Sequence, residues 1–145
     1  MKKVILLLCV VALCFTSCKK DEENANPYVG KYKGTFTTVG ENNTTKEATV
    51  RITEGLGTNL MLEYVIDMKK LDEGRYECDG SNSLTTTLLS TILSLCGLNN
   101  EYFDGTVEKI TVDARFSGDN LKMTIDYRTS LGVTVTSTFQ GSKVK

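Results

Sequence analysis

Apolar and polar residues alternate along most of the chain after Tyr28. A period of two is typical of β-strands that bury one face. Six or seven segments follow it: Tyr32 to Phe36, Ala48 to Ile52, Leu60 to Met68, more weakly Arg75 to Cys78, then Ile110 to Phe116, Leu121 to Tyr127 and Leu131 to Phe139. We therefore predict an all-β domain in which each strand turns one face inward.

Short runs of turn residues separate these segments. Gly118-Asp119-Asn120 is typical of a tight hairpin, and further turns are expected at Gly40 to Asn43, Glu54 to Gly57 and Thr129 to Gly132. Connections this short make neighbouring strands antiparallel. Because open strand edges invite aggregation, we expect a small up-and-down β-barrel, with a sandwich as the alternative.

One stretch in the middle of the chain departs from the period of two. Apolar residues recur there at helical spacing, namely Leu84, Leu88, Ile92 and Leu95, with Leu89, Leu93 and Cys96 beside them. Ser81 or Ser83 is suited to cap the start of a helix, and Gly97 is suited to end it. We predict one short helix between strands, which covers an open end or a seam of the sheet.

The first 17 residues have the three parts of a secretory signal. Lys2 and Lys3 precede an apolar run over residues 4–15, which is shorter than the roughly 20 residues needed to span a bilayer. Small residues and Cys18 follow, an arrangement that resembles the bacterial lipobox. We predict a signal peptide over residues 1–17 and a lipid anchor, with fatty acyl chains such as palmitate on Cys18. A membrane-embedded N-terminal helix, or a secretory signal with an incidental Cys18, is the alternative.

Residues 18–27 are polar after the cysteine and are typical of a flexible tether. The sequence Cys-Lys-Lys-Asp-Glu-Glu resembles the acidic signal that directs some lipoproteins to the outer face of the outer membrane. The resemblance implies a protein at the cell surface that is attached to the outer membrane through its lipid anchor. A charged spacer without targeting information is the alternative.

The ends of the remaining segment, residues 28–145, resemble those of calycin-like (lipocalin-like) bacterial lipoproteins. The likeness rests on Gly30-x-Tyr32 in the first strand and on the closing Phe139-Gln140-Gly141-Ser142-Lys143. It implies an eight-stranded, cup-shaped barrel that holds a small apolar molecule, with the Tyr32 ring plugging its floor. The tryptophan usual in that floor is absent, since the chain contains none.

Composition argues against several classes of function. The chain has no histidine, the commonest general base and zinc ligand, and no EF-hand or phosphate-binding glycine loop. Without Lys2 and Lys3 the 17 basic residues become 15 against 18 acidic ones, a net charge of −3 that gives no case for nucleic acid. We expect neither an enzyme nor a bound metal or cofactor.

Two cysteines remain outside the signal and the lipidation site. Cys78 and Cys96 either form a disulfide in an oxidising compartment or stay free thiols.

The inward apolar face is the remaining candidate for a site. Its residues either line a cavity for one small ligand or fill the barrel by themselves: Tyr32, Phe36, Leu62, Tyr64, Ile66, Ile110, Val112, Phe116, Met123, Ile125, Tyr127, Val135 and Phe139. A cavity indicates an apolar-ligand carrier. A filled barrel indicates a structural or protein-interaction subunit of the cell envelope, whose partner the residues do not identify.

Overall fold

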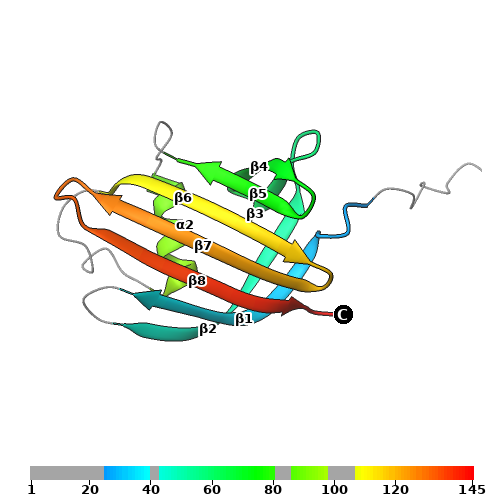
Figure 1. Ribbon diagram of the computed structural model, residues 1–145, viewed down its shortest axis with the longest axis horizontal. Coiled ribbons are helices and arrows are strands. Elements are labelled where there is room, and N and C mark those ends of the chain that lie inside the picture. The colour runs from blue at the N-terminus through cyan, green and yellow to red at the C-terminus, as the bar shows by residue number, and fades with distance from the viewer. Residues whose placement is uncertain (1–24, 40–42, 81–85, 98–106) are drawn as a thin grey trace, which may run out of the picture.

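The computed structural model describes residues 25–39, 43–80, 86–97 and 107–145 (Figure 1). Eight antiparallel strands form a closed barrel in which each strand pairs with the next and β8 pairs with β1. The strands are β1 Gly30–Val39, β2 Thr44–Glu54, β3 Leu60–Leu62, β4 Ile66–Asp72, β5 Arg75–Asp79, β6 Val107–Ser117, β7 Asn120–Thr129 and β8 Thr134–Lys143. The predicted fold class, a small calycin-like up-and-down barrel with one short helix, is confirmed.

The structure has an eighth strand because one segment that was predicted as a single strand forms two strands, β3 and β4. The segment from Leu60 to Met68 reverses direction at a turn over residues 63–65, so that Leu62 pairs with Ile66. Glu63 and Tyr64 adopt positive φ angles of 51° and 62° in this turn. The Glu63 N–H donates to the carbonyl oxygen of Arg51 (2.9 Å), which anchors the turn on β2.

The prediction that Tyr64 faces inward is therefore wrong. Its side chain is 61 % exposed, because a residue in this turn points away from the barrel. The guanidinium carbon of Arg51 lies 5.2 Å from the centre of the Tyr64 ring, a cation–π contact on the outer surface.

The closing hairpin also differs in one detail from the expected pattern. Leu131 and Val133 were predicted to face inward, but they are 68 % and 45 % exposed. Both residues lie in the turn that connects β7 to β8. In this turn the Thr129 N–H donates to the Val133 carbonyl oxygen (2.9 Å). The turn from Thr129 to Gly132 is confirmed, as is the hairpin turn at Gly118-Asp119. The Gly40 to Asn42 part of the first predicted turn lies outside the described residues.

The predicted helix is confirmed as α2, Thr86–Cys96, which ends at Gly97 with a φ of 73°. Figure 1 shows α2 behind the β6–β8 face, in the half of the barrel away from the N-terminal segment. Ile92, Leu93 and Cys96 are buried in the core. Ser81, Ser83 and Leu84 lie outside the described residues, as does the side chain of Leu88. No helix within the described ranges is long and apolar enough to cross a membrane.

Candidate functional site: the barrel interior

The barrel interior contains every residue of the predicted cavity lining except Tyr64. Of these side chains only Phe116, at 8 %, is more than 4 % exposed. A side chain that bordered a water-sized void would keep accessible surface on that side. No water-sized void therefore borders these described side chains, and the interior is filled around them.

Four aromatic side chains, here called the aromatic floor, close one end of the barrel: Tyr28, Tyr32, Tyr76 and Phe116. The Tyr28 ring stacks on Phe116 with centroids 4.8 Å apart, and Tyr32 meets Phe116 edge-on at 5.7 Å. Tyr32 is fully buried beside these rings. Tyr28 and Tyr76 were not predicted, although Tyr76 occupies an inward position of the weak strand and Tyr28 lies two residues before Gly30 of the Gly30-x-Tyr32 motif.

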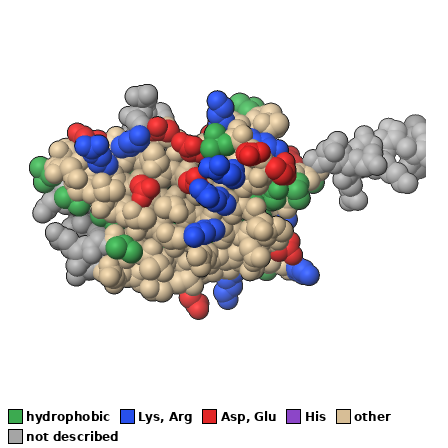
Figure 2. All heavy atoms as spheres, viewed as in Figure 1, with side chains coloured by type: hydrophobic (Ala, Val, Ile, Leu, Met, Phe, Trp, Pro, Cys, Tyr) green, Lys and Arg blue, Asp and Glu red, His purple; other side chains and the backbone are tan. Residues whose placement is uncertain are grey.

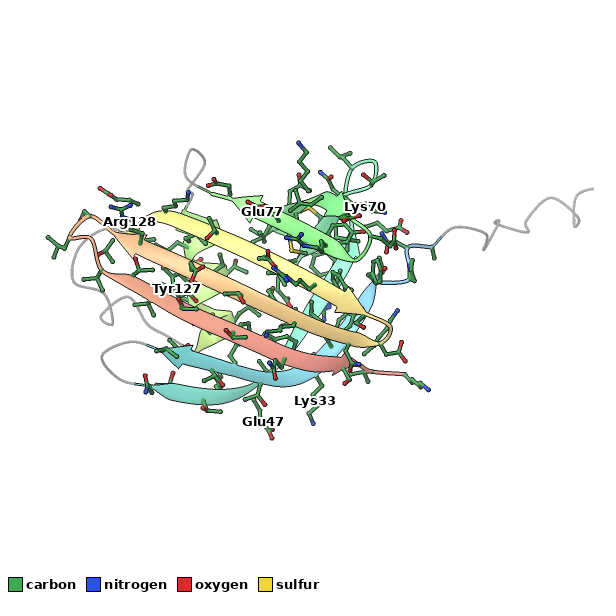
Figure 3. All side chains as sticks on the ribbon, in the orientation of Figure 1. Lys33, Glu47, Lys70, Glu77, Tyr127 and Arg128 are labelled. Carbon is green, nitrogen blue, oxygen red and sulfur yellow. The ribbon has the colours of Figure 1, made fainter. Side chains whose placement is uncertain are left out.

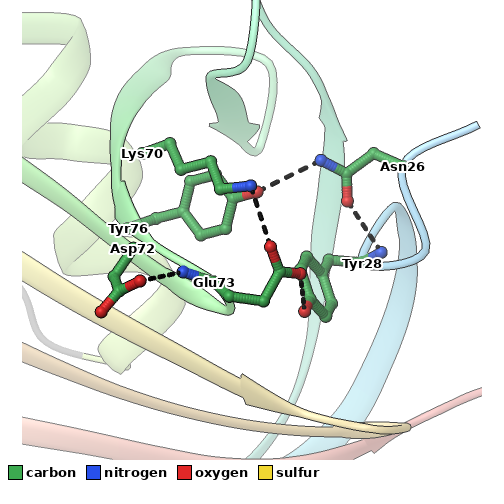
Figure 4. A network of polar contacts seen from close by, with 6 residues as sticks. All are labelled: Asn26, Tyr28, Lys70, Asp72, Glu73 and Tyr76. Atoms are coloured by element: carbon green, nitrogen blue, oxygen red, sulfur yellow. Dashed lines mark hydrogen bonds and ion pairs between the residues drawn. The ribbon is translucent and has the colours of Figure 1, made fainter.

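A polar network outside the floor holds the incoming chain against the barrel (Figure 4). The Asn26 side-chain amide donates to the Tyr76 hydroxyl (3.2 Å), and the Tyr28 hydroxyl donates to Glu73 Oε1 (2.7 Å). Glu73 also pairs with Lys70 (3.1 Å). The hydrogen bond from Tyr28 and the nearby Lys70 ammonium lower the pKa of Glu73. These contacts fix the point at which the N-terminal segment leaves the barrel.

Because Tyr32 is buried, we expect the stability of the protein to depend on pH in the alkaline range. Desolvation, with smaller contributions from Asp119 and Tyr28, raises the Tyr32 pKa from 10.0 to about 12. The folded state then binds one proton more than the unfolded state in this window, so stability falls as pH rises from 10 towards 12. We expect Tyr32 to account for a loss of about 1–2 kcal/mol by pH 11.5.

Urea unfolding of the wild type and of Tyr32→Phe from pH 9 to 11.5 measures this loss. The variant should show a shallower decline, while Tyr127, whose burial raises its pKa as well, contributes equally to both proteins. Parallel pH profiles would show that Tyr32 is not desolvated.

A buried polar cluster lies in the half of the barrel covered by α2. The Tyr127 hydroxyl donates to Cys96 Sγ (2.6 Å) and lies 3.4 Å from Ser137 Oγ, which in turn shares a hydrogen bond of 2.6 Å with Thr38 Oγ1. Cys96 belongs to α2 and Tyr127 to β7, so the helix reaches across the interior. Every buried side-chain nitrogen or oxygen in the described part of the chain has a partner. These polar groups therefore need no ligand to satisfy them.

Both remaining cysteines are free thiols, so the disulfide alternative is not realised. Cys78 is half-buried and Cys96 is buried, with its sulfur accepting the Tyr127 hydrogen bond. Desolvation raises the pKa of both thiols, which makes them poor nucleophiles at neutral pH. Cys18 lies outside the described residues.

Grooves lined by described residues lie outside the core. One of about 470 Å³ follows the outer wall over β6, β7 and β8, and one of about 530 Å³ lies at the floor end beside Asn26 and Glu73. Within the described ranges, no three Cys, Asp or Glu side chains are placed to hold a metal ion. Comparison with protein-family models, curated proteins and solved structures gives no match. The geometry of the barrel is therefore the basis for a functional proposal.

Proposed function

We propose that the chain is a lipid-anchored cell-envelope protein whose barrel is a packed scaffold that presents its outer surface to a protein partner. The observation that carries this proposal is the absence of accessible surface on the inward side chains. A filled interior leaves the outside of the barrel as the surface available for binding.

The proposed anchor would orient the barrel relative to the membrane. The chain enters the barrel at the aromatic floor, where Asn26 and Tyr28 are held by the polar network. A tether that begins at an acylated Cys18 brings the floor end towards the membrane and turns the opposite end away from it. At that opposite end Val39, at the end of β1, and Leu131 and Val133, just before β8, are 58 %, 68 % and 45 % exposed. A protein contact at this end would bury these exposed apolar side chains.

A second candidate is a carrier of a small apolar ligand in a calycin-like cup. The position of α2 favours it, because the helix contributes Ile92, Leu93 and Cys96 to the core in the half of the barrel away from the aromatic floor. Movement of this helix would open an apolar space. A ligand would then have to displace the Cys96–Tyr127 hydrogen bond.

Native mass spectrometry distinguishes these two candidates. The protein, purified from membranes in a mild detergent, is exposed to extracts of lipids and small metabolites and measured with its acyl groups in place. We expect the mass of the acylated chain without an adduct. A reproducible adduct of defined mass that disappears on denaturation would replace the packed scaffold with the ligand carrier.

The anchor and the contact surface need tests in cells. Radioactive palmitate should label the wild type, and Cys18→Ala should abolish both the label and the membrane association. A photo-crosslinking residue at Leu131 should give one defined protein adduct, whereas the same residue at Glu47, which points outward from β2, should not (Figure 3). Unlabelled wild type, or identical adducts at both positions, would contradict the anchor or the contact surface respectively.

A further inference from the structure

Three basic side chains lie opposite one another on the outer wall of the barrel, near the floor end. Arg75 on β5 is in register with Arg115 on β6, and Arg115 is in register with Lys122 on β7. Like charges directly opposite on neighbouring strands destabilise a sheet. Figure 2 shows basic side chains gathered over β6 and β7, whereas the wall over β8 and β1 is largely uncharged. The fold itself does not require this row.

Carboxylates neutralise only part of the positive charge of this basic row. Asp113 accepts a hydrogen bond from Arg115 Nε (2.9 Å) and lies 3.8 Å from Arg75. Glu77 is the neighbour of Asp113 in register on β5. Glu77 is thus on the Arg75 side of the row, whereas Asp113 is on the same strand as Arg115 and lines a second hollow with Arg115, Lys122 and Thr124. Lys122 forms no hydrogen bond or ion pair with the described residues, so positive charge remains at the Lys122 end.

The Lys122 end of the row borders the groove on the outer wall. Arg115 and Lys122 line this groove of about 470 Å³. Its other lining residues are Phe116, Ser117, Asn120, Leu121, Gln140, Gly141 and Ser142. The Ser142 hydroxyl donates to Asn120 Oδ1 (2.8 Å), which directs the Asn120 amide oxygen to Ser142 and leaves its NH₂ group as a donor. A cationic end thus adjoins amide and hydroxyl groups that are spaced along two strands.

We propose that this groove binds an acidic saccharide. Arg115 and Lys122 pair with the carboxylate, sulfate or phosphate of the sugar, because charge-assisted hydrogen bonds are the strongest that an exposed site forms. Asn120, Gln140 and Ser142 hydrogen-bond to the neighbouring sugar hydroxyls. The volume lies within the range of small-molecule sites. The site is open to solvent, so we expect a dissociation constant of about 1 mM for a single sugar. The inference does not depend on the anchor or on a protein partner.

The test is an NMR titration of the detergent-solubilised, ¹⁵N-labelled protein with glucose 6-phosphate, glucuronate, glucose and inorganic phosphate. We expect saturable shifts with the two acidic sugars, confined to amides of β6, β7 and β8 near the groove. Neutral glucose should give none, and inorganic phosphate should bind more weakly than the sugar phosphate because it lacks the hydroxyls. Raising the salt concentration should weaken the binding.

Substitutions locate the site. Lys122→Gln and Arg115→Gln should each weaken binding about tenfold. Arg128→Gln is the matched control, because Arg128 faces outward on the same strand as Lys122 but at its far end, and binding should be unchanged (Figure 3). The proposal is overturned by the absence of saturable shifts, by an equal response to glucose or to phosphate alone, or by an equal loss in Arg128→Gln. Binding only to anionic lipid vesicles would instead assign the basic row to the membrane surface.

Discussion

Replacement of Gly34 by alanine should destabilise the barrel by about 3 kcal/mol or more. Gly34 faces inward on β1 at the seam where β1 pairs with β8, directly opposite Gly141. A Cβ atom on Gly34 would lie 2.0 Å from the carbonyl oxygen of Gln140 and 2.4 Å from Gly141 Cα. Both are backbone atoms and cannot rotate away. The two strands must separate, which weakens the pairing that closes the barrel.

The Gly118→Ala variant is the matched control for this seam. Gly118 has a φ of 57°, and a Cβ atom there would meet nothing within 4 Å. Only the left-handed backbone opposes the substitution, at a cost of about 1 kcal/mol. Urea unfolding followed by circular dichroism should therefore give a much lower midpoint for Gly34→Ala than for Gly118→Ala. Equal midpoints would mean that β1 and β8 leave room for a methyl group at Gly34, contrary to the close backbone contact in the structure.

Alternation predicted the strands well because the barrel buries one face of each strand. The period of two nevertheless hid the turn between β3 and β4. Leu62 and Ile66 both face inward on opposite arms of this turn, and the three residues between them preserve the alternation. No glycine, proline or asparagine marks residues 63–65. A tight reversal of this kind is visible only once the pairing partners are known.

The closure of the interior could not be predicted for a different reason. Tyr28, Tyr76 and Phe116 come from distant parts of the chain, and only the barrel brings their rings together. The hydrogen bond from Tyr127 to Cys96 likewise joins residues 31 positions apart, on a strand and a helix. A list of inward residues states what the interior contains. Whether these side chains fill it depends on the curvature of the wall and on where α2 lies.

The Phe36→Ala variant tests directly whether the barrel is filled. Phe36 is 1 % exposed, and its ring lies 5.1 Å from the ring of Phe139, so truncation leaves a hole that neighbouring strands cannot close. We expect a loss of about 3–5 kcal/mol in the free energy of unfolding, since the cost combines lost burial with a residual cavity. A residue that lined an existing cavity would tolerate the change at much lower cost. The measurement is again urea unfolding.

Tyr64→Ala is the control for Phe36→Ala, because it removes an aromatic ring of similar size from the outside of the same barrel. Tyr64 is 61 % exposed and its main contact is the cation–π interaction with Arg51. Such a contact at an exposed site contributes about 0.5–1 kcal/mol, so the variant should unfold close to the wild type. A large loss for Phe36 beside a small one for Tyr64 supports a packed scaffold. A small loss for both, together with a ligand adduct, would make the interior a binding cup.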